Sequence, residues 1–251
     1  MFQLKTSQRF IKNSDLVDSL LSKTNITRKS LILEIGTGTG IITERLVERC
    51  GNVISIEKDK KLFRAAQSQL RKFSNLTLIK GDFFKLPLPK REFICFSNIP
   101  FHRTADIVLK LLLETNKCKA AYLFMQKEAA DRFMGRIHTN ILSLQISPLY
   151  ESEILYNCNR SDFDPKPAVD VVFIAFKKRS PPDLNSKEYE MYKRFILFIF
   201  KKGNRSVKNP LLKIMSYKKL KRLQKKLHFQ MHDAPSRLSY QQLLQIFKSI
   251  E

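Results

Sequence analysis

Between about residues 30 and 125, short apolar runs alternate with longer stretches whose apolar residues recur at helical spacing. This alternation is typical of β-α-β units, in which parallel strands form a sheet and helices cover its faces. The chain is therefore predicted to have a doubly wound α/β fold. The expected strands are Leu31–Ile35, Val53–Ile56, Leu76–Ile79, Phe93–Phe96 and Ala120–Phe124. The expected helices are Ile41–Arg49, Lys60–Phe73 and Ala105–Glu114.

The pattern changes after Arg132, where strand-like segments follow one another without long helices between them. These segments predict an antiparallel addition to the sheet. A rigid break at residues 180–182 predicts two domains, 1–179 and 180–251, of which the second is small and helical. The Ser239-to-Gln242 spacing of a capping box supports a final helix there. The expected later strands are Leu142–Ile146, Ile154–Tyr156 and Val169–Phe176.

Positive charge dominates the sequence, with 46 Lys and Arg against 23 Asp and Glu. Residues 181–251 are about twice as basic per residue as the rest, with 16 Lys and Arg against 5 Asp and Glu. Such a balance favours a polyanionic partner, nucleic acid first, and phosphate contacts give affinity with little sequence selectivity. A solvated helix face is the alternative. The densest cluster is Lys213, Lys218, Lys219, Lys221, Arg222, Lys225 and Lys226.

Other classes of protein and site find little support. No apolar run approaches the roughly 20 residues of a membrane-spanning helix. The first residues do not resemble an export signal, so we expect a cytoplasmic protein. Cys50, Cys95, Cys118 and Cys158 are scattered without a C-x-x-C pair, so we expect reduced thiols and no metal site.

The run LILEIGTGTG, residues 31–40, reads as a strand, a glycine-rich turn and the start of a helix. Gly36, Gly38 and Gly40 allow the backbone to approach a ligand closely. A dinucleotide-binding loop would read G-x-G-x-x-G, whereas this one reads G-x-G-x-G and follows an acidic residue, Glu34. A carboxylate suits a cationic ligand better than a pyrophosphate.

Two more carboxylates end the next strands. Glu57 can accept both hydroxyls of a ribose, and Asp82 can accept from an adenine amino group. Taken singly, Glu57 could be a surface carboxylate and Asp82 a helix cap. At successive strand ends they form one pocket with Glu34, and this pattern resembles the class I S-adenosylmethionine methyltransferases.

The tetrad Asn98, Ile99, Pro100 and Phe101 follows the fourth expected strand, at the edge where open α/β sheets bind ligands. The Asn98 side-chain oxygen and the Ile99 carbonyl can accept from an exocyclic amine and direct its lone pair at a methyl group. Pro100 fixes the backbone and lacks a competing N–H. Phe101 offers a face for an extruded base. A plain strand-ending turn with an aromatic plug is the alternative.

The motifs together resemble the ribosomal RNA adenine N6-methyltransferases, and within them the erythromycin-resistance (Erm) methyltransferases, from about residue 5 to the C-terminal helices. The matching segments are Ser7–Phe10, Glu34–Gly40, Glu57, Gly81–Asp82, Asn98–Phe101 and the Phe163-to-Val169 F-x-P-x-P-x-V run.

The resemblance implies methylation of an adenine in 23S rRNA and resistance to macrolide, lincosamide and streptogramin B antibiotics. It implies that the segment from Gln8 to Ile11 closes over the methionine part of S-adenosylmethionine, and that Phe163 packs on the second face of the adenine. Gln8, Arg9, Ile11 and Asn98 join the expected cofactor contacts. Arg9 stands where the family usually has Asn, which favours a backbone contact there, and Phe101 replaces the commoner Tyr while keeping a stacking face.

Other functions stay open on the sequence alone. The nearest is a housekeeping 16S rRNA dimethyltransferase, although the Asn-Ile-Pro form and the short basic tail favour the resistance enzymes. A noncatalytic rRNA-binding or transcription factor would not need the intact Gly36, Glu57, Asp82 and Asn98. A DNA amino-methyltransferase lacks room for its recognition domain, and a dehydrogenase disagrees with the loop spacing. We expect a monomer that acts on 23S rRNA before or during ribosome assembly, with one or two methyl groups added.

Overall fold

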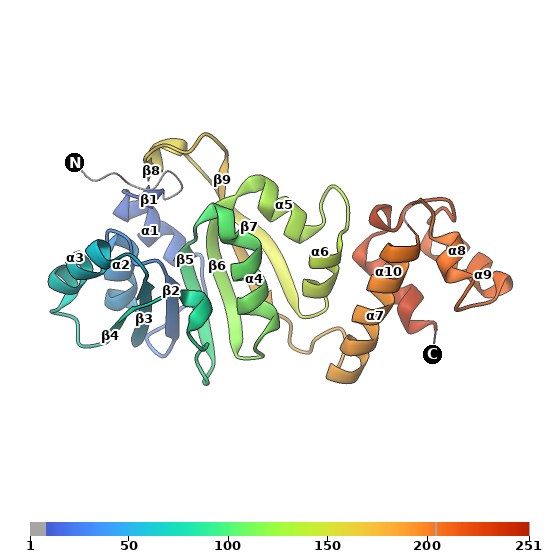
Figure 1. Cartoon of the computed structure of the whole chain (residues 1–251), viewed down its shortest axis with the longest axis horizontal. Coiled ribbons are helices and arrows are strands. Elements are labelled where there is room, and N and C mark those ends of the chain that lie inside the picture. Colours follow the sequence, from blue (N-terminus) through green and yellow to red (C-terminus); the bar gives the residue numbers. More distant parts are fainter. Residues whose placement is uncertain (1–8, 204, 251) are drawn as a thin grey trace. The chain divides into compact units, whose positions relative to one another are not determined.

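The computed structural model describes residues 9–203 and 205–250. Its centre is a seven-stranded sheet in the order β4-β3-β2-β5-β6-β9-β7 (Figure 1). The first five of these strands are parallel, and β9 runs antiparallel to β6. The predicted α/β fold and its antiparallel addition are confirmed. The strands are β2 (Leu31–Ile35), β3 (Asn52–Glu57), β4 (Leu76–Lys80), β5 (Phe93–Asn98), β6 (Cys118–Gln126), β7 (Tyr150–Cys158) and β9 (Val171–Lys178).

The helices between the parallel strands begin where the sequence predicts, within one residue. Asp59 caps α3 by accepting from the backbone N–H groups of Lys61 and Leu62, which satisfies donors that the first helical turn leaves open. The apolar face of the helix Ile41–Arg49 and one face of the sheet belong to the same buried cluster, with Leu46, Ile32 and Phe96 among its residues. The helices are α2 (Ile41–Arg49), α3 (Lys60–Leu70) and α4 (Thr104–Leu113), and the 3₁₀ turns are η1 (Phe83–Lys85) and η2 (Phe101–Arg103).

A short two-stranded ribbon joins the start of the described chain to a distant segment. β1 (Phe10–Ile11) pairs antiparallel with β8 (Phe163–Asp164), which follows the turn η3 (Arg160–Asp162) (Figure 1). Asp162 fastens the ribbon, because its backbone carbonyl accepts from the N–H of Lys12 at 3.0 Å and its carboxylate accepts from Asn13 at 3.4 Å. The sequence analysis did not predict this ribbon.

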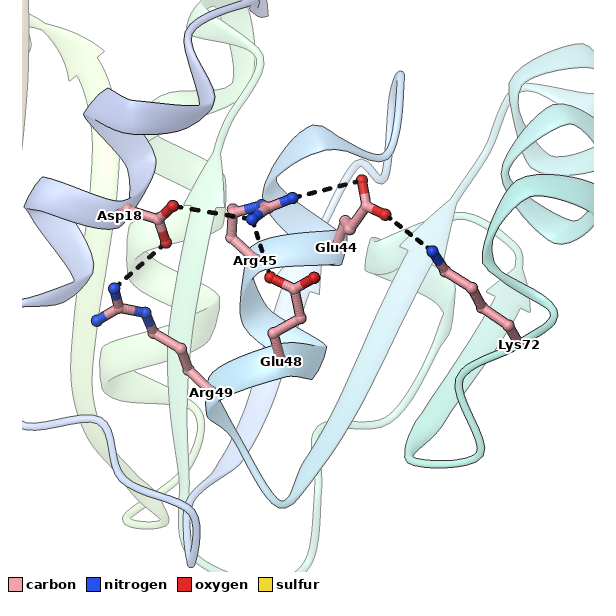
Figure 2. A network of polar contacts seen from close by, with 6 residues as sticks. All are labelled: Asp18, Glu44, Arg45, Glu48, Arg49 and Lys72. Carbon is pink, nitrogen blue, oxygen red and sulfur yellow. Dashed lines mark hydrogen bonds and ion pairs between the residues drawn. The ribbon is translucent and has the colours of Figure 1, made fainter.

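Helix α1 (Ser14–Leu21), which follows β1, is tied to α2 by an ion-pair network (Figure 2). Asp18 lies 3.9 Å from Arg45 and 3.4 Å from Arg49, and Arg45 also pairs with Glu48 at 2.9 Å. Glu44 extends the network to Lys72 at 3.4 Å. Exposed pairs of this kind contribute about 0.2–1 kcal/mol each, so the buried face of α1 supplies most of its attachment.

The chain forms two compact units, one from Met1–Ala130 with Ser152–Lys178 and one from Asp131–Glu151 with Arg179–Glu251. The second unit has its own buried core, to which Leu144, Tyr192 and Ile196 belong. The predicted Ser239 capping box is confirmed. Other elements of the later chain are α5 (Lys127–Met134), α6 (Ile141–Ile146), α7 (Ser186–Lys202), α8 (Lys208–Leu211), α9 (Tyr217–Leu227), η4 (Pro235–Arg237) and α10 (Tyr240–Lys248).

The predicted strand Leu142–Ile146 is wrong, because this segment is helix α6. Asn140 accepts from the backbone N–H of Ser143, whose hydroxyl in turn accepts from the Asn140 N–H, so a complete capping box starts a helix. The buried residues of this helix are Ser143, Leu144 and Ile146. Within residues 9–203 and 205–250, no helix is long and apolar enough to span a membrane.

Candidate active site

The glycine-rich loop leaves β2 and leads into α2, as the sequence predicts. Gly36, Gly38 and Gly40 have φ values of 84°, 57° and 85°, in the left-handed region that favours glycine. A Cβ at Gly36 would meet nothing within 4 Å, whereas one at Gly38 would lie 2.9 Å from the ring of Phe10. The loop therefore has an open position at Gly36 and is covered at Gly38 by the residue that begins β1.

Glu34 lies beneath this loop with no exposed surface. Its Oε2 accepts hydrogen bonds from the hydroxyls of Thr43 and Ser55, both at 2.6 Å. Its Oε1 is buried without a hydrogen-bond partner among the described residues. Burial raises the pKa of Glu34 to about 8, against the lowering effect of the two hydroxyls. A nearby cation would favour the ionised form, so the carboxyl suits a positively charged ligand.

Glu57, the last residue of β3, holds the loop from the neighbouring strand. Its Oε2 accepts from the backbone N–H of Gly38 at 2.9 Å, and its Oε1 accepts from that of Asp59 at 2.8 Å. The side chain is only 3% exposed. Because a carboxylate has about four acceptor sites, these two bonds leave capacity for ligand hydroxyls.

Asp82 follows β4 and caps η1, which is the capping role considered as an alternative for it. Its Oδ1 accepts from the backbone N–H of Phe84 at 3.0 Å, and its Oδ2 accepts from the ammonium of Lys58 at 2.8 Å. The Lys58 contact, followed by the Phe84 bond, lowers the pKa of Asp82. Gly81 donates to the carbonyl of Glu57 at 2.9 Å, which keeps the ends of β3 and β4 together.

The tetrad begins at Asn98, the final residue of β5. Its Nδ2 donates to the backbone carbonyl of Arg9 at 2.5 Å. Ile99 is buried, Pro100 has a φ of −65°, and Phe101 starts η2 with its ring partly buried against the core. The amide nitrogen of Asn98 is therefore committed to the protein, and its oxygen is the acceptor directed elsewhere.

The ribbon of β1 and β8 brings other predicted site residues to this place. Ile11 is the register partner of Phe163, and Arg9 directly precedes β1. Phe163 has no exposed surface, and its ring makes an edge contact with Phe124 at 6.3 Å between centroids. Stacking of Phe163 on a base thus requires its ring to leave this position. Gln8 lies outside the described residues.

The predicted RNA-binding residues belong to the other compact unit and are not part of this cluster. Apart from Lys213, which precedes the helix, they lie on α9. Leu220 is the buried residue of α9, while its cations are exposed, apart from Lys219, which is partly buried. The exposed residues are Lys213, Lys218, Lys221, Arg222 and Lys225.

Sequence reasoning missed three groups that hold the site. Thr43 and Ser55 hold Glu34, and Lys110 of α4 binds the turn after Asp82. A signal was available for two of them, since Ser55 interrupts the apolar strand NVISIE and Lys110 interrupts the apolar helix TADIVLKLLL. Polar residues at otherwise buried positions need partners, and these partners lie in the site.

The sequence matches one family model and is similar to several named proteins. A model of the ribosomal RNA adenine dimethylase family matches residues 1–251. A ribosomal RNA small subunit methyltransferase A of Thermotoga maritima is 32% identical over 83% of this chain and 74% of that protein. An rRNA adenine N-6-methyltransferase of Bacillus licheniformis is 26% identical over 98% of this chain and 86% of that protein.

Solved structures agree with this result at the level of the fold. The 23S rRNA methyltransferase ErmE has a TM-score of 0.89 at 22% identity and covers 96% of this chain and 99% of its own. A dimethyladenosine transferase from Plasmodium falciparum has a TM-score of 0.75 at 21% identity, with coverage of 96% and 98%. The chain therefore belongs to the ribosomal RNA adenine dimethylase family and is an rRNA adenine methyltransferase that uses S-adenosylmethionine.

Proposed function

We propose that the protein methylates the N6 amino group of an adenine in 23S rRNA, and that this modification confers resistance to macrolide, lincosamide and streptogramin B antibiotics. The observation that carries the catalytic part is the hydrogen bond from Asn98 Nδ2 to the Arg9 carbonyl. Because the nitrogen is used there, the side chain presents its oxygen as an acceptor for the target amine.

The tetrad makes a weakly nucleophilic amine reactive. The lone pair of an exocyclic amine is delocalised into the base, so the amine must become pyramidal before it can attack. Asn98 Oδ1 and the carbonyl of Ile99 accept its two N–H groups as positive charge develops on nitrogen. Phe101 stacks on the base and holds it in place. The methylated nitrogen then releases a proton to water, so no general base is required.

The cofactor pocket is formed by the ends of β2, β3 and β4. S-adenosylmethionine supplies an electrophilic methyl group on a cationic sulfur. The buried and unpartnered Oε1 of Glu34 and the open position at Gly36 fit a cationic ligand that approaches the loop backbone. Glu57 then accepts from the ribose hydroxyls and Asp82 from the adenine amino group. Arg9 and Ile11 cover the ligand through their backbone.

The basic face of α9 binds RNA phosphates in this proposal. Its cations project from a helix that buries Leu220 on the opposite side. Contacts of this type add affinity without reading sequence, so base selection belongs to the tetrad and its surroundings.

The 23S assignment rests on the Asn-Ile-Pro form of the tetrad and the likeness to rRNA adenine N-6-methyltransferases over 98% of the chain. A 16S rRNA target is the second candidate. The 32% identity to a small subunit methyltransferase favours it.

Labelled S-adenosylmethionine and protein-free 23S and 16S transcripts separate the two candidates. We expect label at one adenine of 23S rRNA, and mass analysis of the nucleoside counts the methyl groups added. Label in 16S rRNA alone contradicts the 23S assignment, and label in neither contradicts catalysis on free rRNA. Expression in a macrolide-sensitive bacterium should raise the inhibitory concentration of erythromycin. The Asn98→Ala variant, expressed at the same level, is the control and should not.

A further inference from the structure

The ammonium of Lys110 is buried and bound entirely to the turn that follows Asp82. It donates to the backbone carbonyls of Phe83 at 3.0 Å, Phe84 at 3.2 Å and Leu86 at 2.8 Å. These bonds use the three N–H groups of an ammonium. The residue is only 8% exposed. A charge this deeply buried needs such partners, so the turn and the lysine hold each other in one arrangement.

One peptide group connects Lys110 to Asp82. The carbonyl of Phe83 and the N–H of Phe84 belong to the same peptide plane. The carbonyl accepts from Lys110, and the N–H donates to Asp82 Oδ1 at 3.0 Å. A cation at the carbonyl end polarises the peptide and strengthens the bond that its N–H makes, because hydrogen bonds in a chain reinforce one another.

Two cations from the segment that follows the tetrad contact the aromatic side chains of the turn. The Lys110 ammonium lies 4.9 Å from the centroid of the Phe83 ring, and the guanidinium of Arg103 lies 3.9 Å from that of Phe84. Arg103 ends η2, which begins at Phe101, and Lys110 lies on α4, which follows directly. The segment after the tetrad therefore fixes the turn that carries Asp82.

We propose that Lys110 is a positioning residue for S-adenosylmethionine, acting through the Phe83–Phe84 peptide to orient the carboxylate of Asp82. The inference rests on the proposed contact of Asp82 with the adenine of the cofactor. Lys110 touches neither cofactor nor RNA in this role. It couples the adenine side of the pocket to the helix that follows the catalytic tetrad.

A double-mutant cycle on the full-length protein tests the relay, with the dissociation constant for S-adenosylmethionine measured by calorimetry in the absence of RNA. We expect Lys110→Met to raise this constant on the order of tenfold, the lower end of the loss that follows when outer-shell partners of metal ligands are removed. We expect Asp82→Asn to raise it as well. In the Asp82→Asn background, Lys110→Met should add little, because the group through which it acts is gone.

Two further variants separate positioning from general stability. Lys110→Arg retains a cation at the carbonyls and should recover part of the affinity, and Lys110→Gln, which keeps a donor without charge, should recover less. Lys119→Met is the matched control, since Lys119 is an exposed lysine of the same unit that pairs with Glu92. It should leave affinity unchanged. If Lys110→Met does not fold, the cycle is run with Lys110→Gln.

Two results would overturn the relay. One is additive losses in the cycle, and the other is an unchanged dissociation constant in a folded Lys110 variant whose melting temperature has fallen. An unchanged constant in Asp82→Asn alone instead counts against the proposed role of Asp82.

Discussion

The side-chain nitrogen of Asn98 donates to the backbone carbonyl of Arg9, 89 positions earlier in the chain. A carbonyl oxygen only accepts, so the contact fixes which end of the Asn98 amide faces the protein. The partner is a backbone atom, so the bond does not require a particular side chain at residue 9. An arginine can therefore stand at residue 9 without loss of this bond.

Replacing Asn98 should reduce turnover far more than RNA binding. In Asn98→Ala, one of two acceptors for the developing charge is lost, and we expect the turnover number to fall by about 10²- to 10³-fold. The dissociation constant for RNA, measured by filter binding, should change by no more than a few-fold. Asn116→Ala, at an exposed position, is the matched control. Equal losses of turnover and RNA affinity would argue against the acceptor role.

Phe101 should act through its ring face alone. Phe101→Tyr keeps that face and should leave turnover within a few-fold of the original. Phe101→Leu fills much of the same volume against the core but cannot stack, so KM for RNA should rise by roughly 5- to 150-fold, equivalent to about 1–3 kcal/mol. Thermal melting of both variants checks that packing is preserved. An unchanged KM for Phe101→Leu would remove stacking from the mechanism.

Gly38 and Gly36 should respond differently to alanine. Both have positive φ, which costs a non-glycine residue about 1–2 kcal/mol. Gly38→Ala also places a Cβ 2.9 Å from the Phe10 ring, whereas Gly36→Ala meets nothing within 4 Å. Urea unfolding should therefore show a larger loss for Gly38→Ala, and Phe10→Ala should relieve the difference. Equal losses of unfolding free energy in the two variants would mean that the Phe10 ring moves aside without destabilising the protein.

Glu34 should make stability fall as pH rises. Burial raises its pKa from 4.5 to about 8, so between these values the folded protein holds a proton that the unfolded chain releases. Stability decreases with pH wherever the folded state binds more protons. Glu34→Gln should remove this part of the slope in urea unfolding between pH 5 and pH 8. Glu114→Gln, at an exposed position, should leave the pH dependence of stability unchanged. An unchanged pH dependence in Glu34→Gln would contradict the contribution assigned to Glu34.

Neutralising the basic face of α9 should flatten the salt dependence of RNA affinity. Each phosphate contact contributes about 0.7–0.9 to the slope of log affinity against log salt concentration. We expect this slope to become shallower when four α9 cations are changed to Gln. Changing four exposed cations of α7 to Gln should alter the slope much less. Equal slopes in the two variants would mean a solvated face. The α9 set is Lys218, Lys219, Lys221 and Arg222, and the α7 set is Lys187, Arg194, Lys201 and Lys202.

Elements with a long periodic pattern could be predicted from the sequence. Helix α2 and strand β2 have the bounds that the sequence predicts, Ile41–Arg49 and Leu31–Ile35. The β1–β8 ribbon could not be predicted, because each strand has two residues and no period can be read from so few. The α6 error came from interpreting an apolar run as a strand, although Asn140 and Ser143 form a capping box at the start of the helix.

For the site as well, local sequence patterns predict where residues lie but not which distant residues they contact. Placement of Glu34, Glu57 and Asp82 at successive strand ends follows from the alternation of the sequence and the parallel sheet. Their partners do not follow from it. Lys110 binds a turn 24 to 27 residues earlier, and only the folded chain reveals this contact. Burial of Phe163 likewise depends on the ring of Phe124, which lies on β6.

The ribbon of β1 and β8 has a consequence for the order in which the enzyme is made. A nascent chain that has emerged as far as the tetrad contains the glycine loop and all three strand-end carboxylates, yet the register partner of Ile11 is still to be synthesised. Phe10 and Ile11 can therefore pair with β8 only after residues 163 and 164 have been synthesised. The parallel strands are thus all synthesised before the ribbon that places Phe10 over Gly38 can form.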